Sequence, residues 1–204
     1  MKIVSGTLID ASNSARLLRR GETIGPFDDL KAMRDAVAGL SFVPRGDLAD
    51  FGRGGPAARL LMLAALLTAG DAGETLPEST GIFGWNGRGC DAENRRFWED
   101  YTANGRESGR GGLFVGTLPS IPFCEAAIAL GIRGPAAYFR TAPETAEFFA
   151  LVAGYPPGDF LVGECGGDGC CMLLLRNGGD DDGSGAPSFP TLRALFEQRW
   201  RTGR

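Results

Sequence analysis

The residues of this chain best suited to covalent chemistry are five cysteines, Cys90, Cys124, Cys165, Cys170 and Cys171. The sequence contains no histidine, so a serine or cysteine triad of the usual kind lacks its base, and no histidine metal site can form. The cysteines are odd in number and irregularly spaced. This argues against a disulfide framework and favours reduced thiols packed as small apolar side chains. An enzyme with Cys124 as nucleophile is an alternative, but it lacks a base to activate the thiol.

Three further segments superficially suit ligand binding, but their residue order disfavours it. Gly84–Gly89 carries its glycines in the reverse order of a dinucleotide-binding loop, which favours a turn. Asp180–Asp182 are consecutive, whereas an EF-hand loop places its ligands at alternate positions. The vicinal Cys170 and Cys171 run into an apolar strand, which favours burial over ligation. We therefore expect no metal and no cofactor.

Composition narrows the class of protein. The chain has 204 residues, enough for one core, and its net charge of −4 without a cluster of basic residues argues against nucleic-acid binding. The longest apolar run, Leu60–Ala69, is shorter than the roughly 20 residues that span a bilayer. Because the N-terminus also lacks the apolar region of a secretion signal, we expect a cytoplasmic protein with no membrane span.

Strand-like and helix-like segments alternate along the chain. This order predicts an α/β fold with a mostly parallel five-stranded sheet covered by helices. The expected strands lie at 2–9, around 82, and at 113–115, 136–140, 160–162 and 171–175; the expected helices lie at 28–38, 57–69, 93–101, 124–130, 144–152 and 190–201. Residues 177–190 are rich in glycine and aspartate, which predicts a flexible loop, and residues 191–204 should form an amphipathic helix that docks back on the core.

The segment Gly131–Pro143 reads Gly-Ile-Arg-Gly-Pro-Ala-Ala-Tyr-Phe-Arg-Thr-Ala-Pro. It resembles the part of β-ketoacyl synthases in which a Gly-Pro turn leads through a buried strand into Thr-Ala-Cys, where the cysteine accepts the acyl group. Pro143 stands at that cysteine position, and the two histidines of the family's active site are also missing. The resemblance therefore implies a subunit without ketosynthase chemistry.

The order of the other segments supports the same resemblance. The segments that match successive family elements are Arg59–Gly70, Gly81–Asn86, Leu118–Pro122, Cys124–Gly131, Asp159–Gly163 and Gly169–Leu175. They cover about two-thirds of the chain and imply the N-terminal half of a thiolase-like fold in residues 1–176. The second half of that fold is absent, so residues 10–55 and 177–204, or a partner, must cover the exposed sheet face.

The resemblance implies a supporting role. The chain would pair with a catalytic ketosynthase as a heterodimer, help to shape its acyl tunnel in fatty-acid or polyketide-type biosynthesis, and meet acyl carrier protein through that complex. It places Ile121, Phe123, Tyr138 and Phe139 near the subunit interface, where large side chains set the depth of a tunnel. Ordinary core packing is the alternative for each of these side chains. The alternative function is a self-associating structural or scaffold protein of the same fold without an acyl ligand.

Overall fold

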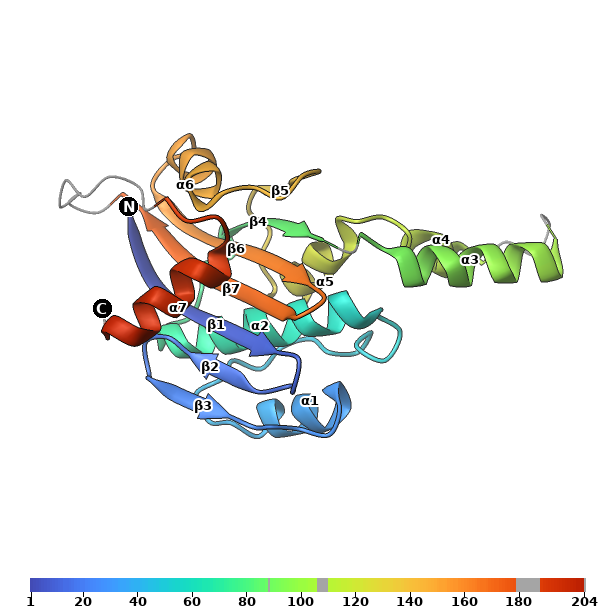
Figure 1. The fold of residues 1–204 in the computed structure, drawn as a ribbon, viewed down its shortest axis with the longest axis horizontal. Coiled ribbons are helices and arrows are strands. Elements are labelled where there is room, and N and C mark those ends of the chain that lie inside the picture. Colours follow the sequence, from blue (N-terminus) through green and yellow to red (C-terminus); the bar gives the residue numbers. More distant parts are fainter. Residues whose placement is uncertain (88, 106–109, 179–187, 204) are drawn as a thin grey trace.

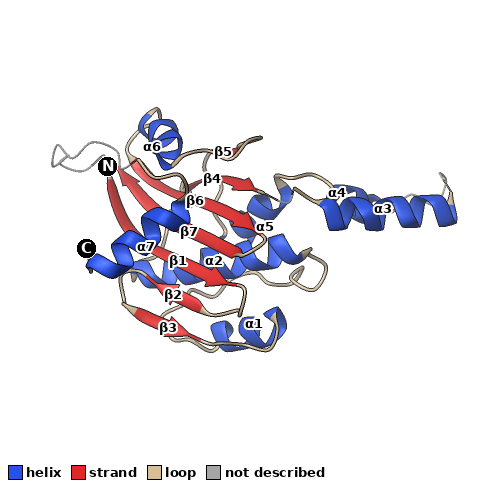
Figure 2. Cartoon of the chain, viewed as in Figure 1, coloured by secondary structure: helices blue, strands red, loops and turns tan. Residues whose placement is uncertain are grey.

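A seven-stranded sheet with helices on both faces forms the centre of the computed structural model, which describes residues 1–87, 89–105, 110–178 and 188–203 (Figures 1 and 2). Its strands are β1 (Lys2–Asp10), β2 (Ala15–Leu17), β3 (Glu22–Ile24), β4 (Gly81–Asn86), β5 (Ala136–Tyr138), β6 (Gly158–Gly166) and β7 (Gly169–Asn177). Its helices are α1 (Leu30–Ala38), α2 (Pro56–Ala72), α3 (Asp91–Asn104), α4 (Gly111–Val115), α5 (Ile121–Leu130), α6 (Thr145–Ala153) and α7 (Leu192–Thr202). The strand order is β3-β2-β1-β7-β6-β4-β5.

The sheet is mixed, so the expectation of a mostly parallel, five-stranded sheet was wrong. Only β4 runs parallel to its neighbours, β5 and β6; the other pairings are antiparallel. The difference arises where strands follow one another without a helix between them. β6 and β7 are joined by the two residues Gly167 and Asp168, and such a short connection can only make an antiparallel pair. The short strands β2 and β3 were not expected from the sequence.

Helix α2 forms the centre of one layer of the core. Apolar residues lie on all sides of this helix, and 13 of its residues are buried. The sheet packs against one side of the helix, and α1, α5 and neighbouring loops pack against the other. We expected the helix to end at Gly70, but it continues to Ala72 and ends at Gly73, which has the left-handed φ of 73°. Gly70 instead lies inside the helix against Phe42 and Val43, where a Cβ atom would crowd the neighbouring chain.

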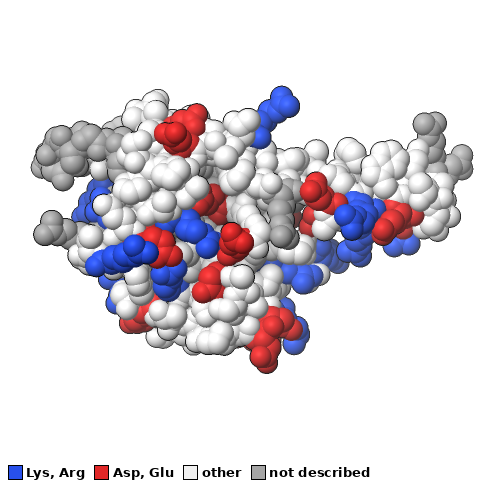
Figure 3. Space-filling model, in the orientation of Figure 1, with Lys and Arg blue, Asp and Glu red and all other residues white. Residues whose placement is uncertain are grey.

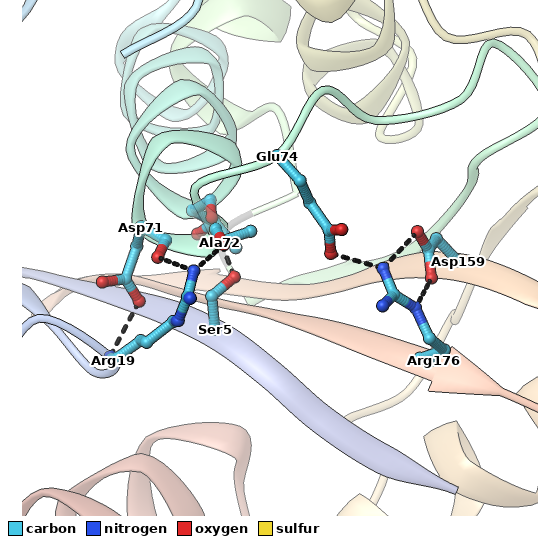
Figure 4. Close-up of polar contacts among 8 residues, drawn as sticks. Ser5, Arg19, Asp71, Ala72, Glu74, Asp159 and Arg176 are labelled. Atoms are coloured by element: carbon cyan, nitrogen blue, oxygen red, sulfur yellow. Dashed lines mark hydrogen bonds and ion pairs between the residues drawn. The ribbon is translucent and has the colours of Figure 1, made fainter. Parts of the chain in front are cut away.

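Polar contacts fix the last turn of α2 to the sheet (Figure 4). The buried carboxylate of Asp71 accepts hydrogen bonds from the backbone N–H groups of Gly6, Arg19 and Arg20 at 2.9–3.1 Å. The guanidinium of Arg19 donates to the carbonyls of Asp71 and Ala72, which satisfies acceptors that a helix end leaves open. Just beyond this turn, Arg176 of β7 joins Glu74 to Asp159.

Helices α6 and α7 cover the other face of the sheet. The predicted C-terminal helix is confirmed, and its Leu192, Leu195 and Phe196 are buried in the second core cluster. The Arg16 guanidinium of β2 forms an ion pair with Glu197 of α7, and it lies 5.7 Å from the Trp200 ring. Residues of the C-terminal segment thus cover this face of the sheet.

Other expectations hold only in part. Leu113–Val115 lies in helix α4, not in a strand, and β5 is an edge strand whose residues are partly or fully exposed, not a buried strand. The hairpin of β6 and β7 and the helix α5 ending at the left-handed Gly131 are confirmed. Most of the predicted flexible loop, residues 179–187, lies outside the described residues.

Candidate functional site

Pro143, at the position predicted for a nucleophile, lies buried between β5 and α6. It precedes the helix cap, Glu144, and the helix that we expected at 144–152 forms at Thr145–Ala153. Glu144 and Glu147 form a reciprocal capping box, in which the Glu144 N–H donates to the Glu147 carboxylate at 2.8 Å. The segment therefore starts a well-capped helix and presents a proline ring, which cannot attack an acyl group.

The cysteine thiols with shifted pKa values all hold their protons more tightly than usual. Burial, with Glu93 and Asp91 nearby, raises the pKa of Cys90 to about 11. Burial and the neighbouring Glu125 raise the pKa of Cys124, the exposed thiol. Since the thiolate is the nucleophile, neither environment activates its cysteine. The alternative of an enzyme based on Cys124 gains no support from this geometry.

Three of the four predicted interface residues lie on the same side of the sheet. The Phe123 ring packs across Gly84 of β4, and its centroid lies 6.2 Å from that of Tyr138. Ile121 stands two residues before Phe123 at the start of α5. Phe139 points to the opposite face, where its ring contacts Phe148 of α6 at 4.8 Å. Phe139 follows Tyr138 directly, and neighbouring residues of an extended chain point to opposite sides.

Helices α3 and α4 extend away from the sheet as an arm (Figure 1). Neither helix contains a buried residue. Four of the large apolar side chains found exposed among the described residues lie on this arm or in the turn after α4: Trp98 (58%), Phe114 (53%), Val115 (45%) and Leu118 (44%). We call these four residues the apolar arm surface. A fifth, Ile128 (58%), lies in the last turn of α5. Exposed apolar side chains that lie close together are typical of interaction surfaces.

The arm holds its own shape through aromatic contacts. The Phe97 ring lies 5.8 Å from Phe114 of α4 and 5.9 Å from Tyr101, and Trp98 meets Tyr101 edge to face. The helix expected at 93–101 is present as α3, but its exposed apolar side chains were not predicted. The available signal was the set of aromatic residues within an otherwise charged segment. On the drawn face of the arm, charged side chains gather along one side and leave the rest uncharged (Figure 3).

A cavity of about 380 Å³ separates the arm from the body. Its lining combines Ile121 of α5 with Leu113 and Val115 of α4. It also carries charges of both signs, from Asp50, Glu93, Glu125, Arg53 and Arg96. Burial, and then the neighbouring Asp50, raises the pKa of Glu125. The apolar part of this lining suits an apolar group.

Strand β5 is a second exposed feature, because it forms an edge of the sheet. It pairs with β4 on one side and forms the edge of the described sheet on the other. An edge strand presents backbone N–H and C=O groups to another chain. In the described part of the chain, no cluster of three or more metal-ligating side chains occurs, and no helix has the length and apolar character needed to cross a bilayer.

By sequence, no protein-family model and no curated protein matches the chain. Solved structures do match its fold. A chain of the ketosynthase ApeO in complex with its chain length factor ApeC, from Xenorhabdus doucetiae, has a TM-score of 0.56 at 11% identity, over 96% of this chain and 89% of that one. A chain of the ishigamide ketosynthase/chain length factor has a TM-score of 0.55 at 14% identity, over 88% of this chain and 63% of that one.

These matches define the class of fold. The mixed α/β architecture with helices on both sheet faces is similar to the thiolase-like fold of ketosynthases, as the Gly131–Pro143 segment predicted. Because the identities are low, the likeness concerns the fold alone. The particular role of this chain has to be argued from its own residues.

Proposed function

We propose that this chain is a non-catalytic ketosynthase-like subunit that pairs with a catalytic β-ketoacyl synthase and helps to shape its acyl tunnel, in fatty-acid or polyketide-type biosynthesis. The observation that carries the proposal is the apolar arm surface, together with the open edge of β5. The exposed side chains of Trp98 and Phe114 are apolar surface that a partner would bury. Pro143 in place of a nucleophile, and the absence of histidine, support the non-catalytic part.

The tunnel-shaping part rests on the same region. Ile121 lines the cavity beside the arm, and Phe123 and Tyr138 lie on the same side of the sheet. Phe139 is included as a residue of the strand edge that a partner would meet, although its ring faces α6. In a complex, acyl carrier protein would reach this chain through the ketosynthase subunit, and the complex would work in the cytoplasm.

Co-expression with the catalytic ketosynthase subunits of the same genome tests the pairing. We expect one of them to co-purify as a heterodimer, and Phe114→Ser combined with Trp98→Ser to abolish co-purification. The control is Phe27→Ser, which alters a partly buried aromatic residue packed on the core outside the apolar arm surface, with its folding checked by circular dichroism. Co-purification of the arm variant at the wild-type level would exclude the arm as the interface.

Product length tests the tunnel. In an intact heterodimer, Ile121→Ala and Phe123→Ala should lengthen the acyl products, because removal of a side chain extends an apolar cavity. The products would be measured by mass spectrometry, with complex integrity checked by size-exclusion chromatography. Unchanged product length for alanine variants at all four positions, Ile121, Phe123, Tyr138 and Phe139, would leave only a scaffold role.

Self-association is the second candidate, since the same surface and the same strand edge could meet a second copy of the chain. Light scattering on the protein purified alone distinguishes the two. A stable homodimer that excludes every co-expressed ketosynthase favours the scaffold function. A monomer that becomes a heterodimer on co-expression favours the subunit function.

A further inference from the structure

The tip of the β6–β7 hairpin places two cysteines directly opposite each other. Cys165 of β6 pairs in register with Cys170 of β7, and the two-residue turn beyond them introduces no register shift. Both side chains belong to the core cluster on the α2 face of the sheet. Cys171 belongs to the cluster on the opposite face. The register therefore selects Cys165 and Cys170 as a pair and excludes the vicinal Cys171.

Backbone hydrogen bonding shows which kind of cross-strand pair this is. The Cys165 carbonyl accepts a hydrogen bond at 2.8 Å from the N–H of Gly87, which follows β4. The backbone polar groups of Cys165 therefore point toward β4 and away from β7. Opposed residues of this non-hydrogen-bonded kind have Cα atoms about 4.5 Å apart, within the range of about 4.4 to 6.8 Å that disulfides span.

The two thiols already contact each other. Burial first, and then a hydrogen bond with the Cys165 side chain, raises the pKa of Cys170. Cys165 also lines a cavity of about 140 Å³ at the hairpin tip, and Cys170 does not. The same cavity is lined by Pro56 and Ala57 of the first turn of α2, whose N-terminal end favours a thiolate.

Asp10 also lines this cavity, and its carboxylate disfavours a thiolate at Cys165. The Asp10 carboxylate accepts hydrogen bonds from the N–H groups of Ser12 and Ser14 at 2.9 and 3.1 Å. These hydrogen bonds hold the Asp10 carboxylate against the backbone of its own turn. Cys165 is thus the member of the pair that borders a cavity, although it is only 3% exposed, and Cys170 lies behind it in the core.

We propose that Cys165 and Cys170 form a reversible dithiol–disulfide site that small-molecule disulfides oxidise. The Cys165 thiolate attacks one sulfur of a disulfide R–S–S–R, forming a mixed disulfide and releasing R–S⁻, which takes up the proton that Cys165 lost. The Cys170 sulfur then attacks the Cys165 sulfur and gives its proton to the departing group. This step forms the Cys165–Cys170 bond, breaks the mixed disulfide and releases the second R–SH.

Oxidation would act on a segment that positions helix α7. The carbonyl of Asp168 in the hairpin turn accepts a hydrogen bond at 2.8 Å from the Arg193 guanidinium. The carboxylate of Glu164, next to Cys165, accepts from the N–H groups of Leu192 and Arg193 at 3.0 and 2.8 Å. A disulfide between the two strands therefore adds a covalent cross-link directly beneath the N-terminus of α7. The inference is independent of the proposed function.

Oxidised glutathione is the probe for this site. The native full-length chain would be incubated with it, alkylated under denaturing conditions and mapped by mass spectrometry. We expect the peptides of Cys165 and Cys170 to be linked, with the loss of two hydrogen atoms, and the link to disappear on reduction. In Cys170→Ala the second step is impossible, so Cys165 should retain glutathione. In Cys165→Ala, Cys170 should stay unmodified.

Two outcomes would overturn the proposal. One is glutathione confined to the exposed Cys124, with Cys165 and Cys170 both recovered as alkylated thiols from the folded protein. The other is a link from either cysteine to Cys171 or to Cys90. Circular dichroism checks that the alanine variants fold. If they do not, the linkage map of the wild-type chain decides the question alone.

Discussion

At the scale of single residues, Gly84 determines how closely α5 approaches the sheet. The Phe123 ring occupies the space that a side chain at position 84 would need, and it also lies near Gly163 on the adjacent strand β6. Phe123 is only 3% exposed. In the isolated chain this ring is therefore a core contact. If it also borders an acyl tunnel, the tunnel must open along the exposed parts of α5 and β5.

Gly84→Ala should destabilise the fold by about 1–3 kcal/mol, because the added methyl group forces the Phe123 ring out of its position. The free energy of unfolding, measured in denaturant, provides the test. Gly111→Ala is the matched control, since a Cβ atom there meets nothing within 4 Å. Equal stability of the two variants would contradict the packing described here.

At the scale of elements, two carboxylates connect α7 to the sheet, and their pKa values are shifted in opposite directions. Glu197 lies within α7, and Glu164 of β6 contacts the start of α7. The hydrogen bond and ion pair with Arg16 lower the pKa of Glu197. Burial raises the pKa of Glu164, although it accepts backbone hydrogen bonds from Arg193 and Leu192 at the start of α7. Ionised Glu197 therefore favours the folded state, whereas ionisation of Glu164 has a desolvation cost that its helix contacts only partly offset.

Glu197→Gln should lower the free energy of unfolding by about 0.5–1 kcal/mol at pH 7, since it removes a partly exposed ion pair. A carboxylate with a lowered folded-state pKa stabilises the fold above its unfolded pKa, and this stabilisation is lost as the pH falls through the folded value. The difference between variant and wild type should therefore shrink as the pH falls below the usual glutamate pKa of about 4.3 and disappear below the lowered folded-state pKa of Glu197. A difference that persists at low pH would show that packing, not charge, fixes α7.

The raised pKa of Glu164 has the opposite consequence. Its folded state binds a proton more readily than its unfolded state, so this residue makes folding more favourable as the pH falls from above the folded pKa toward the unfolded one. In Glu164→Gln that contribution is absent. The unfolding free energy would be measured against pH in the Glu197→Gln variant, with and without Glu164→Gln. The difference between the two slopes isolates the contribution of Glu164.

At the scale of the whole molecule, the sheet and α2 form a compact body from which α3 and α4 project (Figure 1). The body covers both faces of its sheet with its own helices, including α7. Among the described residues, the apolar arm surface is exposed, and β5 and β3 form the two edges of the sheet. The helices of the chain itself therefore cover both sheet faces, and the exposed apolar side chains among the described residues are concentrated at and near the arm.

The isolated chain should bind a hydrophobic dye such as ANS or self-associate through the arm. Trp98→Ser with Phe114→Ser should reduce both effects while shifting the unfolding midpoint by only a few degrees, because exposed side chains contribute little to stability. Dye fluorescence and light scattering at several protein concentrations provide the measurements. Unchanged dye binding in the double variant would show that the dye binds outside the apolar arm surface.

The amino-acid sequence by itself determined the elements whose signals are local. The apolar run of α2, the strands of the β6–β7 hairpin and the Gly131 cap of α5 follow from propensity and pattern. The absence of histidine and the proline at position 143 are likewise properties of the sequence. The opposite directions of Tyr138 and Phe139 could also have been predicted, because neighbouring residues in a strand alternate between faces.

Tertiary structure alone decided the features that depend on distant segments. β1 lies between β2 and β7 because long-range antiparallel pairing, which leaves no trace in local pattern, outweighs the parallel order that alternating elements suggest. β5 is an edge strand, and Trp98 and Phe114 are exposed, because no other described segment of the chain covers them. Burial is a property of the folded neighbourhood, so a surface for a partner becomes visible only once the rest of the chain has been placed.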